Sequence, residues 1–139
     1  MIVRPATQID AAALVPLLEQ LGYPTAQTAI ETRLKALDPR ATVIVAEEEA
    51  KVLGFIAVSV RPDFVEERAV VEGLVVEHNA RNRGIGAELL RAAEAWAAAA
   101  GATAMLVRSN VVRDDAHRFY EREGYRRRKS QHIFEKPMK

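Results

Sequence analysis

The sequence predicts a single α/β domain, in which a mixed, twisted sheet of about six to seven strands carries helices on both faces. Its 139 residues are enough for one domain and too few for two ordinary ones. Hydrophobic residues make up 49% of the chain, so a sizeable core can be buried. Segments of strand and helix periodicity follow the order β-α-α-β-β-β-α-β-α-β-β, which is typical of a mixed sheet.

The N-terminal part is expected to hold one strand and two helices. Residues 2–6 form the short strand. Asp10 can cap a helix that runs to Leu21, because leucines recur at helical spacing and Gly22 follows as a stop signal. A second helix is expected over residues 28–37.

The middle of the chain predicts a hairpin and a crossover. Strands over residues 41–46 and 52–60 are joined by an acidic turn at 47–51. A third apolar run, residues 69–76, leads into an alanine-rich helix over 84–100 and then into another strand. Such a strand–helix–strand unit places its two strands parallel, with the helix on one face of the sheet.

The C-terminal part predicts three strands and a helix. The strand that completes the crossover spans residues 104–108. A helix follows over 114–123, with Gly124 at its end. Residues 125–127 and 131–135 are expected to close the sheet as two further strands.

Composition excludes several classes of function. The absence of cysteine excludes disulfides, thiolate metal sites and a cysteine nucleophile. His78, His117 and His132 have no ligand spacing, so no metal is expected. There is no apolar run of the roughly 18 residues that a membrane span needs, and the N-terminus lacks a signal-peptide pattern. A net charge of +1 gives no reason to expect nucleic acid, so a cytoplasmic protein without a membrane or nucleic-acid partner is predicted.

The charge is unevenly distributed along the chain. Residues 1–78 carry 7 basic and 12 acidic side chains, a net charge of −5, whereas residues 79–139 carry 13 and 7, a net charge of +6. The two halves can differ simply because their solvated faces differ. Alternatively, the C-terminal half meets an anion while the N-terminal half accepts a cation.

A glycine-punctuated turn between a strand and the long helix predicts a phosphate site. At a helix start, unpaired N–H groups and the positive end of the dipole point outwards, and glycine allows close approach. Arg81 and Arg83 can add charge-assisted bonds. The expected binding residues are Arg81, Asn82, Arg83, Gly84, Ile85, Gly86 and Ala87. The plainer interpretation is a helix start with flexible glycines and two solvated arginines.

The pattern of this turn narrows the choice of phosphate ligand. A dinucleotide fingerprint needs a glycine where this chain has Leu89, and the Gly-Lys-Ser/Thr end of a Walker loop is absent. The pattern Arg81-x-x-Gly84-x-Gly86 instead resembles the one that holds the coenzyme A pyrophosphate in the GNAT superfamily of N-acetyltransferases.

A second segment, about thirty residues further on, resembles the same superfamily. It carries an alanine, then Phe-Tyr, then Gly-Tyr at the spacing of the GNAT ending: Ala116, Phe119, Tyr120, Gly124 and Tyr125. The resemblance implies one N-acetyltransferase domain over residues 1–139, with acetyl-CoA as co-substrate and no metal. Many relatives bind the coenzyme through an asparagine three residues before the alanine. Here that position is Arg113, and Asn110 is the other candidate for the contact.

Acetyl transfer to an amine gives roles to the carboxylate and the hydroxyl in these motifs. An alkyl ammonium has a pKa of roughly 10, so a base must first remove a proton. The resemblance implies that Glu72 is this base, that Tyr120 protonates the leaving thiolate, and that a bulge near Gly73 frees main-chain groups. The expected main-chain contacts to the coenzyme are Leu74, Val75 and Val76. Otherwise these residues are an ordinary strand glutamate, a core tyrosine and core side chains.

The acceptor is expected to be a small cationic amine or a peptide amine. In GNAT enzymes it lies against the N-terminal helices and the C-terminal hairpin, and the acidic N-terminal half would suit a cation. The candidate lining residues are Tyr23, Pro24, Glu66, Glu67 and Gln131. The alternative is a non-catalytic sensor that binds acyl-CoA, although a sensor needs neither Glu72 nor Tyr120. A homodimer is plausible, since many small relatives pair through their C-terminal strands.

Overall fold

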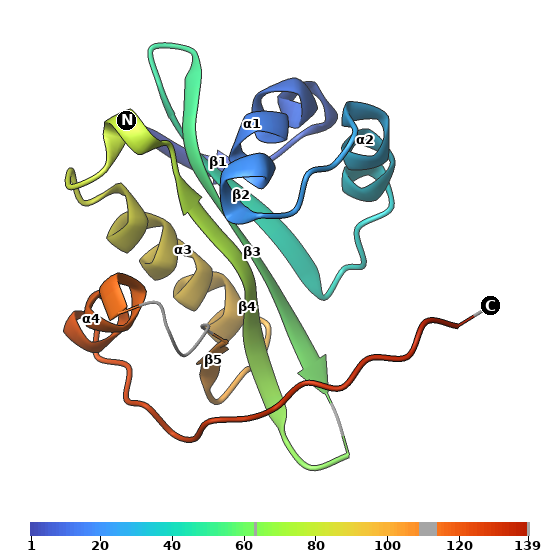
Figure 1. Ribbon diagram of the computed structural model, residues 1–139, viewed down its shortest axis with the longest axis vertical. Helices are drawn as coiled ribbons and strands as arrows, with labels where there is room; N and C mark the ends of the chain where they lie inside the picture. The colour runs from blue at the N-terminus through green and yellow to red at the C-terminus, as the bar shows by residue number, and fades with distance from the viewer. Residues whose placement is uncertain (63, 109–113, 139) are drawn as a thin grey trace. The chain divides into compact units, whose positions relative to one another are not determined.

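The computed structural model describes residues 1–62, 64–108 and 114–138 (Figure 1). The chain divides into two compact units, Met1–Arg108 and Ser109–Lys139. The first unit holds a sheet and three α-helices, and the second holds one α-helix followed by extended chain. The single domain over residues 1–139 stays a prediction.

Within the described residues, five strands form one sheet in the order β1-β2-β3-β4-β5. Neighbouring strands are antiparallel, except that β4 and β5 run parallel, as the crossover predicted. The mixed sheet is therefore confirmed. The strands are β1 (Ile2–Pro5), β2 (Ala41–Glu48), β3 (Lys51–Pro62), β4 (Glu67–Val76) and β5 (Met105–Val107).

Helices cover both faces of the sheet, as predicted. On one face, α1 (Ala11–Leu21) and α2 (Gln27–Lys35) pack over a core cluster. On the other, α3 (Ile85–Ala99) crosses β2, β3 and β4 (Figure 1). The buried residues of the first cluster are Ala11, Leu14, Leu17, Ile30, Val45, Phe55 and Val75. Those of α3 are Ile85, Leu89, Leu90, Ala93 and Ala97.

Two glycines show how closely the layers approach. A Cβ on Gly54 would lie 2.7 Å from the Val75 carbonyl oxygen and 3.3 Å from Leu89 of α3. A Cβ on Gly73 would lie 3.0 Å from Leu21 at the end of α1. Gly54 therefore faces α3 and Gly73 faces α1, and neither position has room for a larger residue without movement.

The two C-terminal strands are not formed, so the count of six to seven is wrong for the described residues. Residues 125–138 belong to no strand. Their start carries four consecutive cations, residues 126–129, and Ile133 and Phe134 are 83% and 93% exposed. An isolated hairpin is at best marginally stable in water, and the described part of this unit offers no strand for it to pair with. No helix in the described chain has the length and apolar character required to cross a membrane.

Candidate functional site

Strand β4 contains a bulge at Glu72. Near its start, the N–H of Ala69 donates to Ala104 on the β5 side at 2.9 Å. Just after its end, the N–H of Glu77 donates to Leu53 of β3 at 2.7 Å. Along a regular strand, residues an even number apart direct their N–H groups to the same neighbouring strand. Ala69 and Glu77 are an even number of residues apart but bond to different strands, so one extra residue must lie between them. The register identifies it: Gly73 pairs with Ala57 and Val71 with Val58, which leaves Glu72 over.

The bulge coincides with the end of the β4–β5 pairing. The parallel ladder joins Ala69–Val71 to Met105–Val107, and in the described chain no strand pairs with that edge of β4 beyond Val71. Because the N–H of Glu77 faces β3, alternation turns the main chain of Leu74 and Val76 to the open edge. The same alternation turns the main chain of Val75 towards β3, and its side chain is buried in the core cluster that α1 covers. Two of the three predicted main-chain positions, Leu74 and Val76, thus face the open edge of β4.

The side chain of Glu72 is held on the face that α1 covers. The Ser59 hydroxyl donates to Glu72 Oε1 at 2.6 Å, and Ser59 is buried. Arg61 Nε donates to the Ser59 hydroxyl at 3.4 Å, and its Nη2 lies 3.6 Å from Glu72 Oε1. The Glu72 and Arg61 side chains are 47% and 57% exposed, so both reach solvent. We name these three residues, Ser59, Arg61 and Glu72, the Glu72 cluster.

The loop before α3 has the conformation of an anion site. The Glu77 carboxylate accepts the N–H of Asn79 at 2.7 Å and so caps a short 3₁₀ turn. Asn82 and Gly84 then take positive φ angles of 64° and 79°. A Cβ on Gly84 would meet nothing within 4 Å, so this glycine supplies the backbone angle rather than space. No side chain caps α3, whose first-turn N–H groups belong to Ile85, Gly86 and Ala87. These features fit a diphosphate.

The two arginines of this loop are tied to its surroundings. Arg81 Nε donates to the Val76 carbonyl at 3.2 Å, so the loop is pinned to the open edge of β4. Arg83 Nη2 donates to both carboxylate oxygens of Glu48, at 2.9 and 2.7 Å. This bond from Arg83 holds the pKa of Glu48 below its usual value. The sequence pattern predicts that both arginines contact phosphate, and this stays a prediction. It does not predict that Arg83 pairs with Glu48.

The sequence matches the acetyltransferase (GNAT) family over residues 10–125. This chain is a member of the GNAT family. An aminoalkylphosphonate N-acetyltransferase of Salmonella typhimurium is 32% identical to it over an alignment of 130 residues that covers 88% of this chain and 83% of that protein. An aminoglycoside N(6′)-acetyltransferase of Klebsiella aerogenes is 38% identical over an alignment of 74 residues that covers 50% of this chain and 48% of that protein.

Solved structures share the GNAT fold with this chain. An aminoglycoside 6′-N-acetyltransferase from Acinetobacter haemolyticus matches with a TM-score of 0.86 at 18% identity, over 100% of both chains. An aminoglycoside N-acetyltransferase in complex with coenzyme A matches with a TM-score of 0.85 at 19% identity, over 99% of this chain and 100% of that one. The protein is therefore an acyl-CoA-dependent N-acetyltransferase, with acetyl-CoA as its co-substrate.

The second unit carries the predicted GNAT tyrosine. Tyr120 lies on α4 (Asp114–Arg122), where its ring makes edge contacts with Phe119 at 5.1 Å and Tyr125 at 5.9 Å between centroids. The N–H of Tyr125 donates to the Tyr120 carbonyl at 2.9 Å, and Gly124 ends the helix at a φ of 93°. The aromatic contacts orient the ring. Proton donation by its hydroxyl stays a prediction.

The predicted acidic acceptor residues do not lie beside Glu72. Glu66 pairs with Arg68 at 3.2 Å, and the Glu67 carboxylate lies 3.6 Å from where a Cβ on Gly101 would be. They precede Glu72 by six and five residues, roughly 16–20 Å along an extended strand. The sequence predicted Glu66 and Glu67 from the acidic character of the N-terminal half, and it missed Ser59 and Arg61, whose place beside Glu72 only the strand register reveals.

The remaining predicted site residues are placed as follows. Tyr23 is 66% exposed just after α1, whose last residue, Leu21, approaches Gly73 on the Glu72 face. Pro24 is exposed beside it. Gln131 lies exposed in the extended chain of the second unit, and the predicted coenzyme contacts Asn110 and Arg113 fall outside the described residues.

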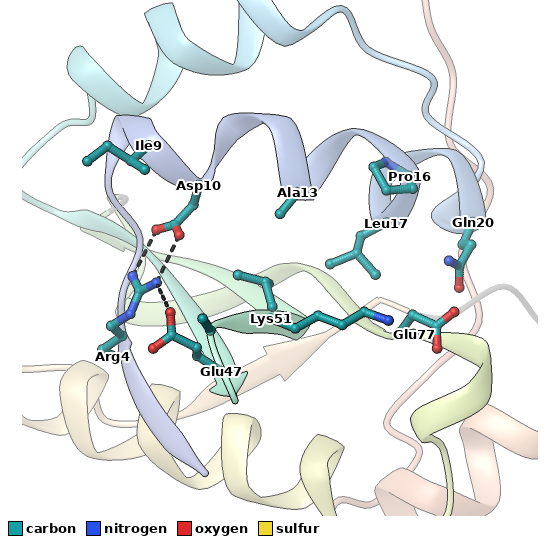
Figure 2. A pocket seen from close by; sticks show the side chains of 12 residues that line it. Arg4, Ile9, Asp10, Ala13, Pro16, Leu17, Gln20, Glu47, Lys51 and Glu77 are labelled. Carbon is teal, nitrogen blue, oxygen red and sulfur yellow. Dashed lines mark hydrogen bonds and ion pairs between the residues drawn. The ribbon is translucent and has the colours of Figure 1, made fainter.

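A cavity of about 530 Å³ lies between α1 and the β2–β3 hairpin (Figure 2). None of the predicted site residues lines it. Figure 2 shows Arg4 bonded to both Asp10 and Glu47 at one end and the Lys51 side chain lying across the other. Its walls are formed by Arg4, Ile9, Asp10, Ala13, Pro16, Leu17, Gln20, Glu47, Ala50, Lys51, Val52 and Glu77. Since Arg4 already has two carboxylate partners, we interpret this network as part of the scaffold.

Proposed function

We propose that this enzyme acetylates the primary amine of a small molecule by direct attack within a ternary complex. Glu72 is the base, acting through a water molecule, and Tyr120 is the acid. The observation that carries the proposal is the bulge at Glu72, because it sets a solvent-reaching carboxylate beside the open edge of β4. The loop before α3 lies just beyond that edge, where its first-turn N–H groups can hold the diphosphate of the co-substrate.

The proposed reaction conserves atoms and charge. Glu72 takes one proton from the ammonium group, and the neutral nitrogen donates its lone pair to the acetyl carbonyl carbon. The carbon–sulfur bond breaks, and Tyr120 donates a proton to the departing sulfur. The nitrogen loses its second proton to solvent, from which Tyr120 is reprotonated, and Glu72 later releases the proton it took. The products are an acetamide, a free thiol and one proton.

Main-chain groups of β4 stabilise the negative charge that develops on the carbonyl oxygen. The N–H groups of Leu74 and Val76 face the open edge and are fixed by the strand, so they need no reorganisation during the reaction. This role agrees with Gly73 at the bulge, where a larger residue would meet Leu21.

The acceptor is proposed to be an amine that arrives as an ammonium ion, either on a small molecule or at a peptide end. Two relatives support a small molecule, because their names specify aminoalkylphosphonates and aminoglycosides as acceptors. The two kinds of acceptor differ in the charge beside the amine that is acetylated. An aminoalkylphosphonate carries an anionic group, whereas an aminoglycoside carries further amines.

Thiol release from acetyl-CoA, measured over a panel of amines, tests the proposal. We expect release that depends on an amine and a matching acetylated product by mass spectrometry. Tyr120→Phe should lower kcat by about tenfold or more, while calorimetry shows coenzyme A binding unchanged. An acyl-CoA sensor would bind the coenzyme equally well and release no thiol with any amine.

The coenzyme site is tested by Gly86→Glu, which places a carboxylate at the first turn of α3. We expect coenzyme A affinity to fall by at least tenfold, because the new charge repels the diphosphate. Ala95→Glu, at an exposed position on the same helix, serves as the control. Equal affinity in both variants would show that the diphosphate binds elsewhere.

A further inference from the structure

We infer that Glu77 is a positioning residue, whose carboxylate fixes the loop before α3 in the conformation that receives the diphosphate of the co-substrate. The inference rests on the proposed function, because it takes the diphosphate to bind at the first turn of α3. It adds the residue that prepares the loop before the coenzyme arrives. The observation behind it is the number of bonds that this one residue makes where the chain leaves β4.

Glu77 makes three bonds at this point. Its N–H donates to the Leu53 carbonyl of β3 at 2.7 Å, which ties the start of the loop to the sheet. Its carboxylate accepts the N–H of Asn79 at 2.7 Å, and its carbonyl accepts the N–H of Ala80 at 2.9 Å. The first N–H groups of a helical turn have no partner within the turn, and here the side chain supplies one. One residue thus closes the 3₁₀ turn that follows β4.

Beyond this turn, the loop is held at both ends of the segment that bends. Ala80 is 4% exposed and Ile85, the first residue of α3, is 2% exposed, so the core anchors the segment on either side. Between them Asn82 adopts a φ of 64°, a left-handed conformation that costs energy for a residue with a Cβ. Such a conformation persists where its surroundings impose it. Glu77 provides that restraint on the β4 side.

A loop that already has its binding conformation loses less conformational entropy when the ligand binds. The N–H groups at the first turn of α3 converge on a diphosphate only while the chain before them keeps its direction. Without the Glu77 carboxylate, the N–H of Asn79 would turn to water and the 3₁₀ turn could open. Binding of the coenzyme would then have to restore the turn, and affinity would fall.

The negative charge of Glu77 acts against this benefit, because a carboxylate and a diphosphate repel each other. The side chain lies in the cavity between α1 and the β2–β3 hairpin, at the end where Gln20 and Lys51 lie (Figure 2). The helix α3 packs on the opposite face of the sheet (Figure 1). The carboxylate is therefore on the side of the sheet away from the helix that holds the diphosphate. We expect the loss of its hydrogen bond to outweigh the loss of its charge.

Calorimetry with coenzyme A and two variants separates the hydrogen bond from the charge. Glu77→Ala removes both, and coenzyme A should bind about fivefold or more weakly, as for a lost cap. Glu77→Gln keeps an oxygen that can accept the Asn79 N–H, so its affinity should stay within about threefold of the native value. Glu19→Ala, at an exposed position on α1, is the control and should bind as the native protein does. Native affinity in Glu77→Ala, or an equal loss in both Glu77 variants, would overturn the inference.

A comparison of two acetyl donors shows whether the effect lies at the diphosphate. Acetylpantetheine carries the thioester but lacks the diphosphate and the nucleotide. With a reactive amine, Glu77→Ala should raise KM for acetyl-CoA about fivefold or more and change kcat less than KM. Its loss in kcat/KM should be larger for acetyl-CoA than for acetylpantetheine by about the same factor. Equal losses with the two donors would indicate a general effect on the fold and contradict the inference.

Hydrogen exchange of the native protein tests the same point without a variant. If Glu77 holds the loop before the coenzyme arrives, the Asn79 amide of the ligand-free protein should exchange at least about tenfold more slowly than in an open chain. Exchange at the open-chain rate would mean that the turn is not formed in advance, and the inference would be wrong. A thermal melt of each variant confirms that affinities are compared between folded proteins.

The outcomes distinguish this inference from the proposed function. If Gly86→Glu loses affinity for coenzyme A and Glu77→Ala does not, the diphosphate site stands and the role of Glu77 is wrong. If Gly86→Glu binds coenzyme A as the native protein does, the diphosphate lies elsewhere and both fail. If no amine releases thiol from acetyl-CoA, acetyl transfer is wrong, whereas the calorimetry and the exchange rate, which need no amine, still decide the role of Glu77.

Discussion

Two arginine–carboxylate clusters in the first unit use the same chemistry for different purposes. In the scaffold cluster, which is Arg4, Asp10 and Glu47, the guanidinium makes two bonds to Asp10 at 2.8 and 2.9 Å and one to Glu47 at 3.0 Å. The Asp10 side chain is only 7% exposed. In the Glu72 cluster, Arg61 stands 3.6 Å from its carboxylate, and about half of each side chain faces solvent.

The difference separates charged side chains that hold the fold together from charged side chains that remain accessible to a ligand. Arg4 and Asp10 join β1 to the chain before α1, and Glu47 adds β2, so the bonds among these three side chains link elements of the scaffold. Asp10 also accepts the N–H of Thr7 at 2.8 Å. In the Glu72 cluster one carboxylate oxygen and most of the guanidinium donors have no bond within the described residues. A ligand can compete for these groups without disturbing the core.

The largest expected effect comes from Glu72→Gln. It should lower kcat by about 10²–10⁴, or roughly 3–5 kcal/mol, because the amide cannot accept the proton. The free energy of unfolding should change by less than about 0.5 kcal/mol, since the side chain is half exposed. Steady-state kinetics and urea unfolding of the same preparation measure both. A large loss of stability with unchanged kcat would place Glu72 in the scaffold instead.

Asp10→Asn should give the opposite pattern. Removing one partner from a mostly buried ion pair leaves Arg4 undercompensated, and we expect a loss of about 2–4 kcal/mol in the free energy of unfolding. Glu19→Gln, at an exposed position on α1, is the matched control and should have little effect. The kcat of folded Asp10→Asn enzyme should equal that of the native protein, so a lower kcat at full folding would contradict the assignment.

The scaffold cluster also predicts a pH dependence of stability. The bonds from Arg4 hold the pKa of Asp10 below its ordinary value near 3.8. A carboxyl group with a lowered folded-state pKa contributes stability that is complete above its unfolded-state pKa and is lost as the pH falls through the folded-state pKa. Native enzyme and Asp10→Asn should therefore differ by a constant amount from pH 7 to about pH 4. Urea unfolding should show the difference shrinking below pH 4, and a difference that shrinks already at pH 6 would implicate another group.

The sequence predicted the arrangement of the first unit because its signals are local. Leucine spacing and Gly22 predict the end of α1, and Gly22 adopts a φ of 99° there. Asp10 does occupy the N-cap position, yet its carboxylate bonds to Arg4 and Thr7 rather than to the helix. Periodicity places a residue at a helix end, but it does not identify a partner on a strand further away.

The site was only partly predictable for the same reason. Glu72 stood out as a charge inside an apolar run, and Gly73 beside it indicated the bulge. Ser59 and Arg61 did not stand out, because their relation to Glu72 depends on the pairing of β3 with β4. The predicted C-terminal strands failed because alternating apolar residues form a strand only where another strand pairs with them.

Ser59→Ala tests whether the Glu72 cluster depends on its buried hydroxyl. Loss of the 2.6 Å bond frees the carboxylate to leave its position, and we expect kcat to fall about five- to tenfold, which corresponds to roughly 1–1.4 kcal/mol. KM for acetyl-CoA should not change. Ser59→Thr keeps the hydroxyl and should recover most of the loss. A lower melting temperature with native kcat would instead show a role in packing alone.

The smallest expected effect concerns Glu48, whose carboxylate accepts two hydrogen bonds from Arg83 in the loop before α3. Both side chains are about one third to one half exposed, so solvent and salt screen the pair and it contributes little to stability. Glu48→Gln removes the charge that competes with the diphosphate, and coenzyme A should bind up to about fivefold more tightly at low salt. Glu31→Gln, on α2, is the control, and calorimetry at two salt concentrations measures the change. Weaker binding would mean that the carboxylate holds Arg83 in position to bind the diphosphate. Glu48 would then support the binding site and would not compete with the ligand.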